Sequence, residues 1–112
     1  MSNNLCYFEI FTSDLAKSKS FYGQLFNWEI NPWGTQGSYE HIKTPQEPDG
    51  GLWKTEDQKG VLVYFKVEDI DKTLKKVEEL GGKVILKKTE IPNVGHYAIF
   101  ADLDGNQIAL FT

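Results

Sequence analysis

The chain has 112 residues, of which 40% are hydrophobic and 25% charged, so it can form one domain with a core, and disordered or fibrous classes are excluded. A formal net charge of -4, with lysines interleaved among acidic residues, argues against nucleic acid as a partner. With one cysteine, Cys6, and no stretch approaching 18 apolar residues, we expect a cytoplasmic protein without a disulfide, signal peptide or membrane span.

The first half of the sequence predicts one strand, one helix and three short strands. An aromatic and β-branched segment ends at a Ser-Asp pair that can cap a helix, and the apolar residues after it recur at helical spacing. Prolines and glycines then restrict the chain to short strands separated by loops. In order, we expect a strand at 7–12, a helix from Leu15 to Phe26, and strands at 28–30, 39–43 and 51–54.

The second half predicts the same order of elements. Residues 61–67 alternate between two faces, and the next segment predicts a helix with the apolar stripe Ile70, Leu74, Val77 and Leu80. Gly81-Gly82 should end this helix, because a left-handed C-cap favours glycine. Further strands are expected at 83–86, 96–101 and 107–111, the last two joined by a turn rich in Asp, Gly and Asn.

Sliding the sequence by 55 residues superposes the two halves without a gap. The pairs brought together include Asp14 with Asp69, Leu25 with Leu80, Ile30 with Ile85, His41 with His96 and Gly50 with Gly105. We therefore predict an α+β fold made of two βαβββ repeats, about 5–55 and about 60–112, within a single domain that spans 1–112.

Three stretches carry a resemblance to a known family. They are Phe8-Glu9-Ile10 through Asp14-Leu15 to Leu25-Phe26, then Val67-Glu68-Asp69-Ile70 to Leu80-Gly81-Gly82, and then Asp102 to Ile108. This combination resembles the vicinal oxygen chelate superfamily, which has the glyoxalase, bleomycin resistance and extradiol dioxygenase fold. The resemblance implies that two units form a curved mixed sheet or open barrel around a pocket, with the helices outside.

Strand alternation predicts which side chains face such a pocket. Phe8 and Ile10 must pack under the first helix, so the side chains of Tyr7, Glu9 and Phe11 point the other way. On the strand that opens the second half, Leu62, Tyr64 and Lys66 do likewise. Because a buried charge is costly unless it is paired or solvated, Glu9 and Lys66 indicate a wet cavity and not a second core.

The resemblance also implies where a metal would bind. Metal-dependent members take four ligands, typically His, Gln or Glu, from the first and last strands of each unit. The corresponding residues here are Tyr7, Lys54, Leu62 and Ala109, none of which is a His or a carboxylate. We therefore expect neither a metal nor a cofactor. His41 and His96, at equivalent positions of the repeat, leave a zinc or copper pair open as an alternative to two histidines at the solvent edge.

Glu9 is the candidate catalytic residue. A carboxylate between two aromatic residues on the concave face could act as a general base, and the alternative is an exposed or lysine-paired glutamate. The candidate ligand-binding residues are Tyr7, Phe11, Trp33, Lys54, Leu62, Tyr64, Lys66, Gln107 and Ala109. Within this set, Lys54 or Lys66 would hold an anionic group, and Trp33 would cover the pocket mouth or pack on its own loop. Trp53 is interpreted as a core or dimer-interface residue.

These observations favour a metal-independent, glyoxalase-like protein that binds a small molecule and whose catalytic activity is open. One alternative is an enzyme, lyase-like or isomerase-like, that acts on a small carbonyl compound or epimerisable acid with Glu9 as the base. Another is a drug-sequestering resistance protein of the bleomycin-resistance type, with a pocket shared between two subunits. A homodimer is expected, because members of this fold commonly pair and edge strands favour it.

Overall fold

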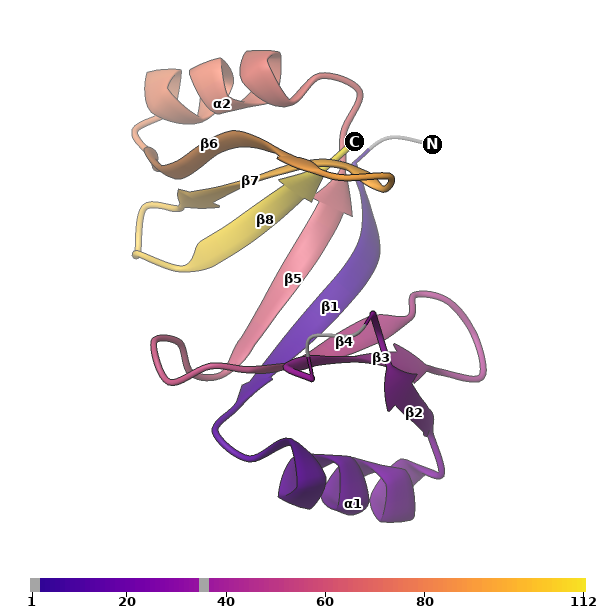
Figure 1. The fold of residues 1–112 in the computed structure, drawn as a ribbon. Coiled ribbons are helices and arrows are strands. Elements are labelled where there is room, and N and C mark those ends of the chain that lie inside the picture. Colours follow the sequence, from indigo (N-terminus) through magenta and orange to yellow (C-terminus); the bar gives the residue numbers. More distant parts are fainter. Residues whose placement is uncertain (1–2, 35–36) are drawn as a thin grey trace. The chain divides into compact units, whose positions relative to one another are not determined.

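The computed structural model describes residues 3–34 and 37–112, which divide into two compact units. The N-terminal unit runs from Cys6 to Leu62, and the C-terminal unit combines Val63–Thr112 with the residues up to Leu5 (Figure 1). Each unit contains one helix and a four-stranded mixed sheet, so the predicted α+β fold with two βαβββ repeats is confirmed. None of the helices in the described residues has both the length and the apolar character that a membrane crossing requires.

In the N-terminal unit the helix α1 lies along one face of the sheet (Figure 1). The strands have the order β2-β3-β4-β1, with β1 parallel to β4 and the other neighbours antiparallel. Helix α1 begins after Asp14, whose side chain accepts a hydrogen bond from the Lys17 backbone amide at 3.1 Å. The elements are β1 (Asn4–Thr12), α1 (Leu15–Phe26), β2 (Glu29–Pro32), β3 (Tyr39–Lys43) and β4 (Gly50–Lys54).

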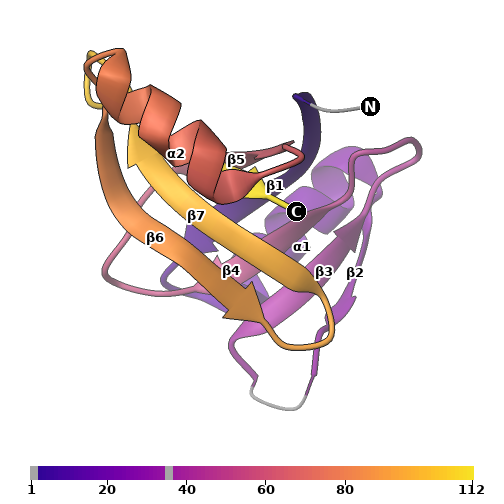
Figure 2. The same ribbon diagram turned by 90° about the horizontal axis from the view of Figure 1, so that it is seen from above.

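In the C-terminal unit α2 lies along one face of a sheet with the order β5-β8-β7-β6 (Figure 2). Strand β5 is parallel to β8, and β6, β7 and β8 are antiparallel neighbours. Strand β6 continues well beyond residue 86, where the predicted strand ended, because its polar second half pairs with β7 as far as Ile91 opposite Gly95. The elements are β5 (Val61–Lys66), α2 (Ile70–Glu79), β6 (Lys83–Ile91), β7 (Gly95–Ala101) and β8 (Gln107–Phe111).

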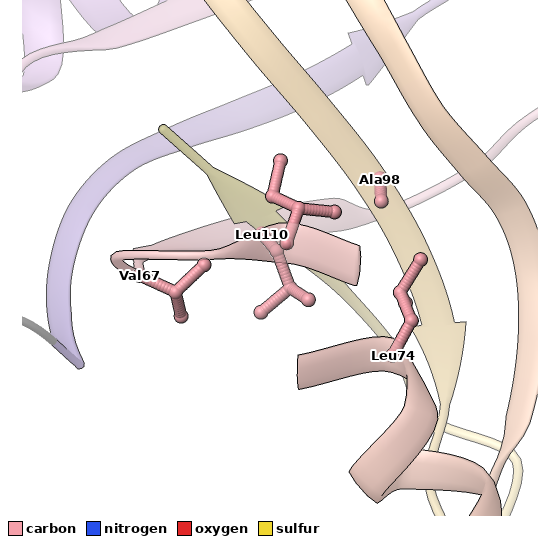
Figure 3. Packing of buried hydrophobic residues seen from close by; sticks show 5 residues of the cluster. Val67, Leu74, Ala98 and Leu110 are labelled. Atoms are coloured by element: carbon pink, nitrogen blue, oxygen red, sulfur yellow. The ribbon is translucent and has the colours of Figure 1, made fainter. Parts of the chain in front are cut away.

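Each unit has its own hydrophobic core between its helix and its sheet. In the C-terminal unit the core consists of Val67, Ile70, Leu74, Ala98 and Leu110 (Figure 3). In the N-terminal unit Ile30, Ile42 and Leu52 are buried, and residues that pack on them include Phe8, Ile10, Leu15 and Tyr22. The predicted packing of Phe8 and Ile10 on the helix side of β1 is therefore confirmed.

The apolar stripes of both helices are less buried than expected. Leu80, predicted to lie in the stripe of the second helix, follows the last residue of α2 and is 69% exposed. None of the twelve residues of α1, all of which the structure describes, is buried. Its exposed apolar side chains are Phe21, Leu25 and Phe26.

The internal repeat does not keep one constant shift, because the last strands are displaced by three further residues. Glu9 pairs with Gly51 in the parallel β1–β4 ladder, and Tyr64 pairs with Ala109 in the parallel β5–β8 ladder. Glu9 and Tyr64 are 55 residues apart, whereas Gly51 and Ala109 are 58 apart. The counterpart of Ala109 is therefore Gly51, and the assignment of Lys54 to that position was wrong.

The same register corrects the proposed histidine pair. His41 lies opposite Gly51 on β4, and the residue in the matching place opposite Ala109 is Ile99. His96 lies opposite Glu90 instead. The two histidines are therefore not equivalent, and the argument for a paired metal site that rested on their equivalence fails.

Candidate functional site

A hydrogen-bonded group of polar side chains lies on the face of the N-terminal sheet away from α1. Because Phe8 and Ile10 face α1, alternation directs Tyr7 and Glu9 to the opposite face. There the Tyr39 hydroxyl donates a hydrogen bond to Glu9 Oε2 at 2.8 Å, and the Tyr7 and Tyr39 hydroxyl oxygens lie 2.6 Å apart. Since a hydroxyl group carries one proton, Tyr7 must donate to Tyr39. We call these residues the Tyr7–Tyr39–Glu9 network.

Glu9 is buried, with 7% of its surface exposed. The alternative interpretation of Glu9 as a solvent-exposed glutamate was therefore wrong. The hydrogen bond from Tyr39 partly replaces the water that the carboxylate gives up on burial.

Gly51 makes room for this network. A Cβ atom built on Gly51 would overlap the hydroxyl group and ring of Tyr39 and would lie 2.7 Å from the Tyr7 hydroxyl oxygen. Glycine on β4 therefore lets the phenol from β3 approach the backbone closely on its way to Glu9 on β1.

Both phenols of the network hold their protons more tightly than usual. Burial raises the pKa of Tyr7 to about 12, partly offset by the hydrogen bond with Tyr39 and increased by the negative charge of Glu9. Burial and the Glu9 carboxylate also raise the pKa of Tyr39. At neutral pH the two side chains are neutral hydroxyl groups that can each accept one hydrogen bond and donate another.

Aromatic rings surround the network on the same face. The Trp53 ring lies 5.7 Å from the Phe11 ring and 6.5 Å from the Tyr39 ring, measured between centroids. Because Trp53 is 39% exposed, its interpretation as a core residue was wrong. Exposed and half-buried aromatic side chains beside a hydrogen-bonding group are typical of a small-molecule site.

Trp33 and His41 form a second cluster in this unit. Their rings lie 5.8 Å apart, and His41 Nε2 lies 3.4 Å from Asp49 Oδ2. Trp33 is 58% exposed. These contacts agree with the alternative that Trp33 packs on its own part of the chain, and its role at a pocket mouth stays a prediction.

Lys54 does not join the network. Leu52 faces the core on the α1 side, so alternation along β4 directs Lys54 toward that side and away from Glu9. The Lys54 side chain is exposed, and its backbone pairs with Thr12 at the end of the β1–β4 ladder. The predicted role of Lys54 in holding an anion beside Glu9 therefore has no support in this unit.

The remaining candidate residues differ in burial. Leu62, at the end of the N-terminal unit, is buried. In the C-terminal unit Tyr64 and Ala109 are buried and paired in register, and the Tyr64 ring lies 6.4 Å from that of Tyr97. Lys66 and Gln107 are exposed.

A separate hollow of about 400 Å³ lies in the N-terminal unit where β1 meets the loop at 55–60. Phe11 is the one predicted ligand-binding residue in its lining. The other lining residues are Thr12, Ser13, Thr55, Glu56, Gln58, Lys59 and Gly60. The lining of this hollow therefore does not include Glu9, Tyr7 or Tyr39.

Tyr39 is the functional residue that sequence reasoning missed. Two signals could have found it. Tyr39 alternates with the buried Ile42 and so faces away from α1, and the adjacent glycines Gly50 and Gly51 within a strand indicate that another group approaches the backbone closely.

Comparison with known proteins identifies the family. The model of the Glyoxalase/Bleomycin resistance protein/Dioxygenase superfamily matches residues 4–110. The chain belongs to this superfamily. The anthracycline biosynthesis protein DnrV of Streptomyces peucetius is 29% identical over 126 aligned residues, which cover 94% of this chain and 45% of the relative. The chain thus spans less than half the length of the curated relatives that match most of it.

Solved structures of other members have the same fold. The methylmalonyl-CoA epimerase of Mycobacterium tuberculosis has a TM-score of 0.75 and 14% identity, over 98% of this chain and 87% of the epimerase. The Mn(II)-bound glyoxalase of Novosphingobium aromaticivorans has a TM-score of 0.74 and 17% identity, over 98% of this chain and 38% of the glyoxalase. At these identities the likeness establishes the fold alone.

The residues at the superfamily's metal-ligand positions do not fit a divalent cation. With Gly51 in place of Lys54, the positions are occupied by Tyr7, Gly51, Leu62 and Ala109. Gly, Leu and Ala side chains have no donor atom, and the raised pKa of Tyr7 keeps its phenol protonated. Within residues 3–34 and 37–112, no group of three His, Cys, Asp or Glu side chains could hold a metal.

Proposed function

We propose that this chain binds a small organic molecule on the face of the N-terminal sheet that carries the Tyr7–Tyr39–Glu9 network, without a metal at the superfamily's ligand positions. The observation behind this proposal is a buried carboxylate hydrogen-bonded to a phenol, next to the aromatic rings of Phe11 and Trp53. A sheet face that served packing alone would be more stable with apolar residues, because burying a charge costs several kcal/mol.

A fragment screen by ¹⁵N NMR tests this proposal. The mixture should contain small carbonyl compounds, organic acids, methylmalonyl-CoA and an anthracycline, the last two because they are named in proteins similar to this one. We expect hits that shift the amide signals of Tyr7, Glu9 and Tyr39 and that bind equally well in EDTA. Hits confined to the hollow beside Ser13, binding that EDTA abolishes, or no hits at all would contradict it.

The matched variants are Tyr39→Phe on the binding face and Tyr22→Phe on the helix side of the same unit. Tyr39→Phe should weaken the affinity of a hit by about tenfold, because it removes the hydroxyl group that joins Tyr7 to Glu9 and so leaves both polar groups of the binding face less well positioned. Tyr22→Phe should leave the affinity unchanged, because Tyr22 packs with the core under α1.

A second candidate function is enzymatic, with Glu9 as the general base toward a small carbonyl compound or an epimerisable acid. The burial of Glu9 and its hydrogen bond from Tyr39 favour it, because a positioned carboxylate shielded from water is suited to removing a proton. In D₂O, Glu9→Gln should slow deuterium incorporation at the α-carbon of methylmalonyl-CoA by about 100-fold or more while leaving binding intact. Deuterium incorporation at an unchanged rate would remove Glu9 from the mechanism.

We further propose a homodimer and a cytoplasmic location. The exposed apolar residues of α1, Phe21 and Leu25 in particular, favour contact with a second copy of the chain. The cytoplasmic location rests on the single cysteine, since no intramolecular disulfide can form.

A further inference from the structure

The three members of the Tyr7–Tyr39–Glu9 network form one continuous, directional series of hydrogen bonds. Tyr7 donates to Tyr39 across 2.6 Å, and Tyr39 donates to Glu9 Oε2 across 2.8 Å. Every proton in the series points toward the carboxylate. Tyr7 lies at the other end of these two bonds, and a phenol oxygen that donates one hydrogen bond can also accept one.

We propose that this network is a proton relay in which Tyr7 Oη takes the proton of a bound molecule and Glu9 is the final acceptor. The bond from the ligand atom to its proton breaks, and its electron pair stays on the ligand. The ligand's proton binds to Tyr7, the Tyr7 proton moves to Tyr39, and the Tyr39 proton moves to Glu9 Oε2. The carboxylate becomes a neutral carboxylic acid, and both phenols remain neutral, with the direction of the two hydrogen bonds reversed. This inference rests on the proposed binding face.

The strand geometry shows why a relay is needed between Tyr7 and Glu9. The two residues are next-nearest neighbours on one face of β1, so their Cα atoms are about 7 Å apart. Tyr39 reaches from β3 over Gly51 and bridges them with one oxygen atom. A glutamate that is 7% exposed thereby connects to Tyr7, which is only half-buried.

The protonation states suit this role. A relay hydroxyl must be neutral, because a phenolate has no proton to pass on. The pKa of Tyr7, raised to about 12 chiefly by burial, and the raised pKa of Tyr39 keep both hydroxyl groups protonated at neutral pH. Because the Tyr7 phenol is neutral, its replacement by phenylalanine should interrupt proton transfer along the network without changing the charge of the network.

Hydrogen exchange of the Tyr39 hydroxyl proton with water, measured by NMR on the ligand-free protein, tests the relay. The signal is assigned by its loss in Tyr39→Phe. In Tyr7→Phe we expect exchange at least about tenfold slower, because the ring remains and the oxygen that passes the proton is gone. The matched control Tyr22→Phe should exchange at the wild-type rate. If Tyr7 only shielded Tyr39 from water, its removal would leave exchange unchanged or accelerate it, and either result would overturn the proposal.

Glu9→Gln provides a second measurement should Tyr7→Phe fold poorly. Glutamine keeps an acceptor oxygen for Tyr39 but does not take up a proton at neutral pH, so exchange should again slow by at least about tenfold. An unchanged rate in this variant would also overturn the relay. Neither exchange rate involves a ligand. A failed fragment screen would therefore contradict the proposed function without changing the exchange rates, and unchanged rates would overturn the relay even if a molecule binds, so the two failures can be told apart.

Discussion

Glu9 determines much of the chemistry of its surroundings. It accepts the Tyr39 hydrogen bond, and its negative charge adds to the effect of burial in raising the pKa of Tyr7 and of Tyr39. The three side chains therefore depend on each other for their protonation states. Substitutions among them should give effects that are not additive, as expected of residues in one hydrogen-bond network.

The alkaline stability of the protein should reveal the buried phenol of Tyr7. Its pKa is about 12 in the folded protein, against 10.0 ordinarily, so the folded state holds this proton more tightly than the unfolded state. The resulting stabilisation is complete below pH 10.0 and is lost as the pH rises to about 12. Tyr7→Phe has no phenol at this position and so lacks this stabilisation. As the pH rises from 10.0 to about 12, the wild type should therefore lose unfolding free energy relative to the variant.

Urea unfolding at a series of pH values from about 9 to about 12 measures this difference, with Tyr22→Phe as the control. A difference between wild type and Tyr7→Phe that stayed constant across the window would show that the folded protein does not retain the Tyr7 proton.

Gly51→Ala should destabilise the protein by about 1–3 kcal/mol, because the new methyl group overlaps the Tyr39 phenol. Much of that loss should disappear when Tyr39 is also changed to alanine. Gly23→Ala in α1 is the matched control, since its Cβ would meet nothing closer than the Trp28 carbonyl oxygen at 3.9 Å. Thermal or urea unfolding of Gly51→Ala, Tyr39→Ala, the double variant and Gly23→Ala checks this. An equal cost of Gly51→Ala in the presence and in the absence of the Tyr39 phenol would disprove the overlap.

At the scale of elements, each unit is stabilised where its helix packs on its sheet. In the C-terminal unit Leu74 of α2 is buried against Ala98 and Leu110. Leu74→Ala should cost about 2–5 kcal/mol in the free energy of unfolding, through lost apolar contact and the cavity left behind. Leu80→Ala, just beyond the same helix and 69% exposed, should change it by no more than about 0.5 kcal/mol. Comparable losses in both variants would mean that Leu80 also belongs to the core.

Helices and strands were predictable from the sequence where local chemistry determines them. Asp14 and Asp69 each cap the helix that follows, and the alternation around Ile10 identifies the helix-facing side of β1 correctly. The second half of β6 was missed, because Lys87 to Glu90 carry no apolar alternation and become a strand only by pairing with β7. Apolar alternation in a sequence predicts a strand that has one buried face. It does not predict a strand whose two faces are both polar and which forms only by pairing with a neighbour.

For the whole molecule, the proposed homodimer predicts a mass in solution of about twice the 12.8 kDa of one chain. Light scattering at micromolar concentration measures this mass. Phe21→Asp should shift the protein toward the monomer, because a charge on the exposed face of α1 disfavours an apolar contact. Leu80→Asp, at an exposed apolar residue of the other unit, should leave the mass unchanged. A wild-type mass near that of one chain would refute the dimer.

The sequence by itself determined the order of the elements, the helix caps, the helix-facing side of β1 and the superfamily, because these depend on periodicity and on chemistry between near neighbours. Only the tertiary structure decided that Tyr39 donates to Glu9, that Gly51 corresponds to Ala109, and that Lys54 lies away from Glu9. These features depend on the register between strands that lie far apart in the sequence. A shift of three residues between the two halves is enough to change that register, and such a shift is not visible in an apolar pattern.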